Sequence, residues 1–105
     1  MFAQAAELVR TAWQEAGRPG APRLVCLGYF ALGPDAAALA EGYLTDYYAF
    51  AGDYTAMVVS GALTSEAAVR DGVAAFADAG CDEMILFPCS PNPEQLQRLA
   101  DVTLG

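Results

Sequence analysis

Apolar residues follow two different patterns along this chain of 105 residues. They are consecutive in two short stretches, within 24–30 and 83–88, and recur every three or four positions elsewhere. Short consecutive runs bounded by turn residues are typical of strands buried on both faces, whereas the wider spacing is typical of helices with one buried stripe. The sequence therefore predicts two doubly buried strands set among helices.

Three helices are predicted before residue 61. The first covers 3–16 and ends at Gly17. The second opens at Gly33-Pro34-Asp35, because proline lacks the amide hydrogen that would have no partner in a first helical turn. The third covers 54–60. The inner face of the second helix is predicted from its apolar spacing: Ala36, Leu39, Ala40, Tyr43, Leu44, Tyr47 and Phe50.

Two more helices are predicted, one on each side of the second strand. Thr64 is the expected N-cap of the first, and Gly80 is its C-terminal stop. Asn92 with Gln95 three residues later forms a capping-box pattern for the last helix. The predicted inner faces are Val69, Gly72, Val73, Phe76 and Ala79 in the first and Leu96, Leu99 and Ala100 in the second.

The order of these elements predicts an α/β fold. Helices between the strands imply a parallel pair joined by a right-handed crossover. Two strands do not make a self-sufficient sheet, and 105 residues fall far short of the roughly 250 of a complete eight-fold barrel. We therefore expect residues 1–105 to form a single partial domain of a larger α/β architecture.

Composition and charge exclude several function classes. Charged residues make up 17% of the chain, against about 25% in average domains, which predicts apolar surface that meets another protein segment. The net charge of −8 and the scattered arginines argue against nucleic acid and anionic membranes. No apolar run is long enough to span a membrane and no secretory signal is present, so we expect a cytoplasmic protein.

The cysteines favour a reducing compartment. Cys26, Cys81 and Cys89 are odd in number and include no Cys-x-x-Cys pair. The chain has no histidine, so a zinc site would need all three thiols and a carboxylate, and we expect no metal. Cys26 and Cys81 are interpreted as small apolar core residues.

Two segments resemble a known family. Residues 62–71 (ALTSEAAVRD) and 76–88 (FADAGCDEMILFP) are similar to the C-terminal end of luciferase-like flavin-dependent monooxygenases. That family often carries a Gly-Thr-Pro-Glu helix start, a helix ending in Ala-Gly-hydrophobic-Asp, and then the last barrel strand. Here the start is Leu63-Thr64-Ser65-Glu66, with serine in place of the usual proline. Residues 23–48 resemble the preceding strand and helix.

The resemblance implies a fold, a cofactor and an activity. The fold would be a (β/α)8 TIM barrel of which this chain holds the last two βα units. The intact protein would be a flavin- or F420-dependent oxidoreductase, a monooxygenase acting on small organic substrates with FMN or coenzyme F420. Histidines that the family often uses near its flavin have no counterpart here, so no catalytic residue is assigned and the isolated chain is expected to be inactive.

Candidate cofactor-binding residues lie where the two strands end, because barrel ligands meet the C-terminal ends of strands. The aromatic rings of Tyr29 and Phe30 can stack near an isoalloxazine or pack in a core. Phe87, Cys89 and Ser90 can border a phosphate or flavin edge or belong to a plain βα loop. Cys89 as a nucleophile has no histidine to activate it, which favours an inert thiol.

Two further questions stay open from the sequence. Aromatic residues at 43, 47, 48, 50 and 54 fit either an oligomer interface or packing on the chain's own strands. The chain itself fits a homo-oligomer or a segment that joins a missing N-terminal barrel portion. The alternative functions are a small non-catalytic self-associating α/β interaction module and a half-size flavin binder completed by dimerisation.

Overall fold

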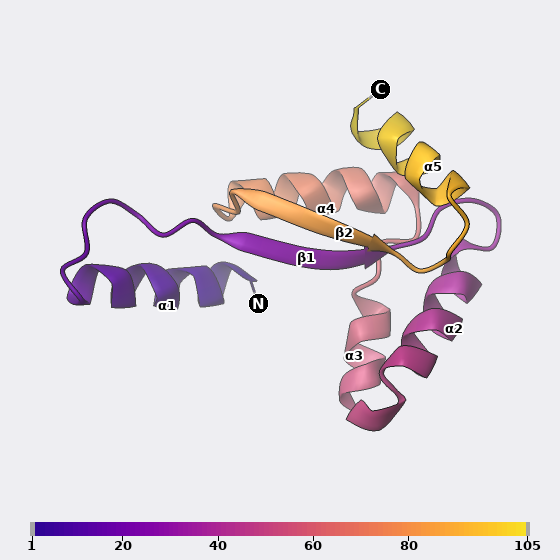
Figure 1. Cartoon of the computed structure of the whole chain (residues 1–105), viewed down its shortest axis with the longest axis horizontal. Coiled ribbons are helices and arrows are strands. Elements are labelled where there is room, and N and C mark those ends of the chain that lie inside the picture. Colours follow the sequence, from indigo (N-terminus) through magenta and orange to yellow (C-terminus); the bar gives the residue numbers. More distant parts are fainter. Residues whose placement is uncertain (1, 105) are drawn as a thin grey trace.

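The computed structural model describes residues 2–104 as a two-stranded parallel sheet with flanking helices (Figure 1). The predicted mixed α/β class and the parallel strand pair are confirmed. In chain order the elements are α1 (Phe2–Glu15), β1 (Val25–Phe30), α2 (Ala36–Tyr47), the 3-10 helix η1 (Ala49–Ala51), α3 (Tyr54–Ser60), α4 (Glu66–Asp78), β2 (Glu83–Pro88) and α5 (Glu94–Thr103).

The sheet is extended at one corner by a single residue. The two strands pair in register from Val25 opposite Glu83 to Phe30 opposite Pro88. On the other edge of β1, the Leu63 amide donates to the Tyr29 carbonyl at 2.9 Å, and the Leu63 carbonyl accepts from the Ala31 amide at 3.0 Å. The segment before α4 therefore pairs only with the C-terminal end of β1.

The prediction that both faces of the strands are buried is wrong within this chain. Side chains alternate between the faces of a strand. One face, here called the open face, carries three residues of each strand: Val25, Leu27 and Tyr29 of β1, and Glu83, Ile85 and Phe87 of β2. Four of them are 47% (Val25), 57% (Leu27), 42% (Ile85) and 44% (Phe87) exposed. Helices α4 and α5 contribute to the core on the opposite face, whereas α2 and α3 project away from the sheet as a pair (Figure 1).

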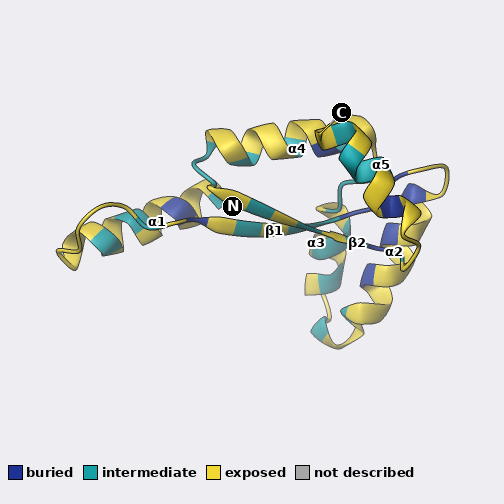
Figure 2. Cartoon of the chain, turned by 45° about the horizontal axis from the view of Figure 1, so that its top comes forward, coloured by how far each residue is buried: buried dark blue, intermediate teal, exposed yellow. Residues whose placement is uncertain are grey.

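The core is divided into two small clusters around the C-terminal ends of the strands (Figure 2). On the covered face, Phe30, Leu32 and Val69 are buried against Leu86 and Leu99. The second cluster joins the strand ends to the α2–α3 pair and consists of Ala31, Ala36, Ala40, Leu44 and Cys89. The N-terminal halves of both strands contribute little to either cluster.

The molecule has more surface than its size requires. Its radius of gyration is 15.6 Å, against about 13 Å for a compact domain of this length. Its accessible surface is 6870 Å², against about 5,600 Å² for a folded monomer of the same mass. The excess is about 1,200 Å², and exposed large apolar residues lie on α1, on the open face and on the projecting helices.

A helix is present at each predicted place, but α2 ends at Tyr47 instead of continuing through Phe50, and not all of the predicted inner faces are buried. Helix α2 begins at Ala36, two residues after Pro34, and only Ala36, Ala40 and Leu44 of its predicted stripe are buried. The aromatic residues of that stripe point away because only one side of α2 meets the strand ends and α3. In α5, Leu96 is exposed and Gln95 is buried instead.

Two predicted caps differ from the structure. The N-cap of α4 is Ser65 rather than Thr64, and the Ser65 hydroxyl accepts a hydrogen bond from the Ala68 amide at 3.0 Å. The N-cap of α5 is Pro93 rather than Asn92, and the Asn92 side chain, one residue earlier, accepts from the Glu94 amide at 3.0 Å. The capping box is absent because the Gln95 amide binds the backbone of Leu32.

Helix α1 is attached to the C-terminal end of α4. The Arg10 guanidinium donates to the carbonyl oxygens of Ala79 and Gly80 at 3.3 and 3.5 Å. The Phe2 and Phe76 rings meet edge to face, with centroids 5.2 Å apart. Among residues 2–104, no helix combines the length and hydropathy needed to cross a bilayer.

Candidate functional site

Tyr29 and Phe87 lie side by side on the open face at the C-terminal end of the sheet. They occupy opposed positions of the parallel register, so their side chains leave the same face. Their ring centroids are 6.0 Å apart with an interplanar angle of 36°. The structure thus brings these two predicted site residues together as one aromatic wall.

A third aromatic residue fixes the position of Tyr29. The Tyr29 and Tyr48 hydroxyl oxygens are 2.6 Å apart, and the two rings meet edge to face at 6.0 Å. Tyr48 follows the last residue of α2, and its own ring contacts those of Tyr47 and Tyr54. The hydrogen bond and the edge-to-face contact with Tyr48 hold the Tyr29 ring against the end of α2.

An open pocket of about 410 Å³ lies between this aromatic group and α3. Its volume falls in the usual range of small-molecule sites. One wall is the outer surface of β1, and the other walls come from the C-cap of α2 and from α3. The lining residues include Leu27, Gly28, Tyr29, Tyr48, Tyr54 and Met57.

The chemistry of this pocket favours a neutral, planar, apolar ligand. The hydrogen bond to Tyr48, together with burial, raises the pKa of Tyr29 above its usual value, so the Tyr29 phenol stays neutral. One hydroxyl must donate to the other, which leaves the second hydroxyl proton free for a carbonyl or ring nitrogen of a ligand.

The pocket has no cation for a phosphate. Each arginine of the chain interacts elsewhere: Arg10 with Glu7, Arg18 with the Trp13 ring, Arg23 with Glu83, Arg70 with Glu66 and Arg98 with Glu94. None of them lines the pocket. The phosphate of FMN or F420 would therefore have to be held by other protein segments.

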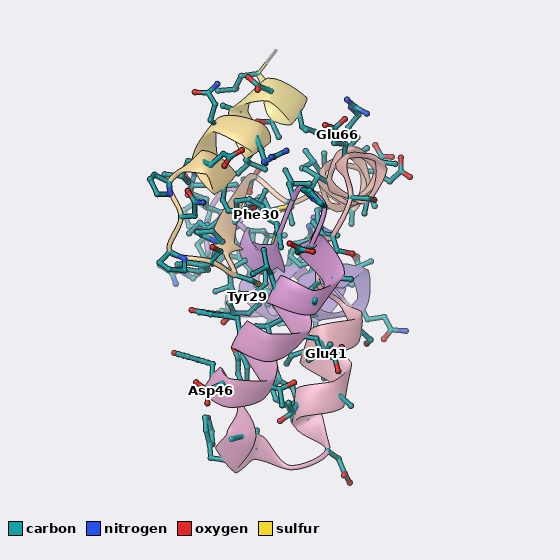
Figure 3. The ribbon with its side chains drawn as sticks, turned by 90° about the vertical axis from the view of Figure 1, so that its right-hand side faces the viewer. Tyr29, Phe30, Glu41, Asp46 and Glu66 are labelled. Atoms are coloured by element: carbon teal, nitrogen blue, oxygen red, sulfur yellow. The ribbon has the colours of Figure 1, made fainter. Side chains whose placement is uncertain are left out.

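The remaining predicted site residues lie apart from this wall. Phe30 is fully buried with Leu32 and Val69 on the covered face, and Figure 3 shows it on the other side of the strand from Tyr29. Ser90 is in the loop after β2, where its hydroxyl accepts from the Asn92 amide at 3.2 Å. The structure does not bring these two residues to the pocket.

Cys89 is almost completely buried in the cluster under α2. Burial raises the pKa of its thiol to about 11, which disfavours the thiolate that a nucleophile needs. Its amide continues the sheet by donating to the Phe30 carbonyl at 2.9 Å. This environment fits the interpretation of Cys89 as an inert core thiol.

The aromatic residues that the sequence left open divide between the two interpretations. Tyr48 is half-buried against Tyr29, whereas Tyr43, Tyr47, Phe50 and Tyr54 are exposed, Phe50 to 84%. Sequence reasoning flagged this group but did not identify Tyr48 as the partner of Tyr29, since nothing in the local pattern distinguishes it from Tyr47.

Carboxylates do not assemble into a second site in the part of the chain that the structure describes. Glu41 and Asp46 lie on the outer side of α2 (Figure 3), and no group of three or more Cys, Asp or Glu side chains is placed to hold a metal ion among residues 2–104. Asp82 has a structural role, since its carboxylate accepts from the Leu24 amide at 2.7 Å.

Comparison of this chain with protein-family models, with curated proteins and with solved structures found no match.

Proposed function

We propose that this chain supplies the last two βα units of a luciferase-like barrel whose other strands come from another polypeptide segment. In the assembled protein, the aromatic wall of Tyr29 and Phe87 borders the cofactor, FMN or coenzyme F420. The assembled enzyme is an oxidoreductase acting on small organic substrates, and the chain alone is inactive. The resemblance of residues 62–71 and 76–88 to the end of that family supplies the cofactor class.

The observation that carries the proposal is the open face. Four apolar residues of this face, Val25, Leu27, Ile85 and Phe87, are each more than two-fifths exposed, and Glu83 at its N-terminal end is the one charged residue among its six positions. In a closed barrel, the inward side chains of each strand are covered by those of the other strands. The open face is the side that such a barrel interior would cover.

The position of the aromatic wall supports a role near a ligand. Barrel enzymes bind their ligands at the C-terminal ends of the strands, where Tyr29 and Phe87 lie. An offset contact between two aromatic rings contributes about 1 kcal/mol beyond the burial of apolar area, so Tyr29 and Phe87 could each add such a contact with a planar ligand. The reduced flavin or deazaflavin would supply the hydride, and this chain would supply ring contacts and one hydroxyl.

The test is cofactor binding by the chain alone and by the chain coexpressed with the polypeptide encoded directly upstream. We expect no saturable quenching of FMN or F420 fluorescence by the chain alone, and saturable binding by the complex. Tyr29→Ala and Phe87→Ala should each weaken that binding roughly tenfold. Trp13→Ala is the control, because this aromatic residue lies on α1, outside the pocket and outside the aromatic group around Tyr48.

Three results would contradict the proposal. Tight binding of either cofactor by the chain alone would show that the site needs no other segment. A stable complex that binds neither cofactor would refute the flavin assignment. An upstream region that encodes no α/β strands would remove the source of the missing units.

A second candidate is a self-associating interaction module without chemistry, and the surface area favours it. A standard interface buries about 800 Å² on each partner, which is less than the excess of about 1,200 Å² on this chain. Two copies could cover their open faces against each other. A colourless dimer that binds neither the upstream polypeptide nor the cofactors would favour this candidate over the barrel.

A further inference from the structure

Two cysteine side chains that are far apart in the sequence meet at the start of the sheet. Cys26 is the second residue of β1, and Cys81 lies in the turn between α4 and β2. Their sulfur atoms are 2.9 Å apart, close enough for one thiol to hydrogen-bond to the other. Both side chains are partly accessible to solvent.

The backbone on both sides of this contact is held in place independently of the thiols. The Asp82 amide donates to the Leu24 carbonyl at 2.8 Å, and the Asp82 carboxylate accepts from the Leu24 amide at 2.7 Å. Beyond them, Cys26 stands opposite Met84 in the strand register. With the backbone held in this way, the side chains of Cys26 and Cys81 reach one another, and their sulfur atoms lie 2.9 Å apart in the folded chain.

We propose that Cys26 and Cys81 form a reversible disulfide that fastens the start of β1 to the start of β2. The oxidant is a small-molecule disulfide of the glutathione class, and excess thiol reverses the reaction. This inference does not depend on the cofactor or the partner proposed above. It replaces the interpretation of these two cysteines as core residues with a modification site.

The chemistry proceeds by two thiol–disulfide exchanges. The Cys81 thiolate attacks one sulfur of the oxidant, forms a mixed disulfide and releases one thiolate. The Cys26 sulfur then attacks the Cys81 sulfur, loses its proton and releases the second small thiol. The two protein thiols are oxidised to one disulfide, and the oxidant is reduced to two thiols.

The environments of the two sulfurs fit this order. Burial, together with the hydrogen bond that the Cys26 thiol donates to Cys81, raises the pKa of Cys26 to about 12, so Cys26 is a poor first nucleophile. Once Cys81 carries the mixed disulfide, the contact between the two sulfurs makes the second step intramolecular. Cys89 does not compete, because it is buried beyond the opposite end of the strands.

The bond would strengthen the weakest part of the sheet. The N-terminal halves of β1 and β2 contribute little to the core, and one of their faces is open. A bridge between residues 55 positions apart also restricts the unfolded chain, and longer loops give larger stabilisation. Oxidation would therefore stabilise the strand pair before it meets any partner.

The test is incubation of the folded chain with oxidised glutathione, followed by intact-mass measurement, peptide mapping and thermal unfolding. We expect a monomer that has lost two hydrogens, one cross-linked peptide joining Cys26 to Cys81, and a midpoint several degrees higher that returns to its starting value with dithiothreitol. Cys89→Ser should behave like the unmodified chain. Cys26→Ser and Cys81→Ser should show no internal bond and no rise in midpoint.

Other outcomes would overturn the proposal. A bridge that includes Cys89, a disulfide between two chains, or stable glutathione adducts without an internal bond would each show that the contact is not a working pair. A Cys26–Cys81 bridge that forms only in urea would show that the folded geometry does not favour it.

Discussion

The side-chain amide of Gln95 forms a pair of hydrogen bonds with the backbone of Leu32. Its nitrogen donates to the Leu32 carbonyl at 2.9 Å, and its oxygen accepts from the Leu32 amide at 2.8 Å. Both residues are buried, and they belong to the loop after β1 and the first turn of α5. Leu32 lies in an irregular, buried part of the backbone. The Gln95 side chain gives its amide and carbonyl the hydrogen-bond partners that a neighbouring strand would otherwise provide.

Replacing Gln95 should therefore cost more than an ordinary helix substitution. Gln95→Ala leaves the buried amide and carbonyl of Leu32 without partners, and we expect the free energy of unfolding to fall by about 3 kcal/mol. Urea unfolding followed by circular dichroism measures this. Gln97→Ala is the control, since Gln97 is exposed on the same helix, and it should change stability by less than about 0.5 kcal/mol. Equal effects of the two variants would contradict the role assigned to Gln95.

The open face should govern association. Leu27→Lys places a charge in the middle of this face, so we expect lower binding of a hydrophobic fluorescent dye and loss of any dimer or complex. Light scattering after size exclusion gives the molar mass. Leu8→Lys is the matched control, because Leu8 is an exposed leucine on α1. If the Leu8 variant loses association and the Leu27 variant keeps it, the docking surface lies on α1.

The Tyr29–Tyr48 pair should make stability fall at alkaline pH. The pKa of Tyr29 is raised in the folded state, so its contribution is complete below the unfolded value of about 10 and is lost as pH rises through the folded pKa. Tyr48→Phe removes the main cause of the rise. We expect the Tyr29 phenol to titrate earlier in this variant and alkaline destabilisation to be smaller. Absorbance near 295 nm and melting curves across alkaline pH measure both effects, with Tyr54→Phe as the control.

Ser65 and Thr64 provide a direct comparison of two neighbouring hydroxyls. Ser65→Ala removes the acceptor for the Ala68 amide, and we expect a loss of about 1 kcal/mol in the free energy of unfolding. Thr64→Ala leaves this cap in place and should cost less. If chemical unfolding shows that Thr64→Ala lowers the free energy of unfolding more than Ser65→Ala does, Thr64 is the N-cap, as predicted from the sequence.

Elements marked by local signals were predictable from the sequence. β2 spans the expected 83–88, α3 spans the expected 54–60, and Gly80 ends the α4 segment with a φ of 92°. A glycine with positive φ and a short apolar run that ends at a proline depend only on the local backbone conformation. They can therefore be recognised without knowledge of the rest of the fold.

Features that depend on distant partners were not predictable. Gln95 followed a capping-box pattern, but its amide binds a residue 63 positions away and so cannot reach back to Asn92. The same reason explains the open face, because apolar spacing shows which side chains need cover and not whether this chain provides it. For the candidate site, the strand ends indicated Tyr29 and Phe87, whereas the alternation of the strand turned Phe30 to the other face.

Gly80 has a consequence for the attachment of the N-terminal helix. A Cβ at this position would collide with the Arg10 guanidinium, and the positive φ already excludes most side chains. Any replacement at position 80 would therefore displace the arginine that tethers α1 to α4. The attachment of the first helix thus depends on the absence of a side chain in a turn that lies 70 positions further along the chain.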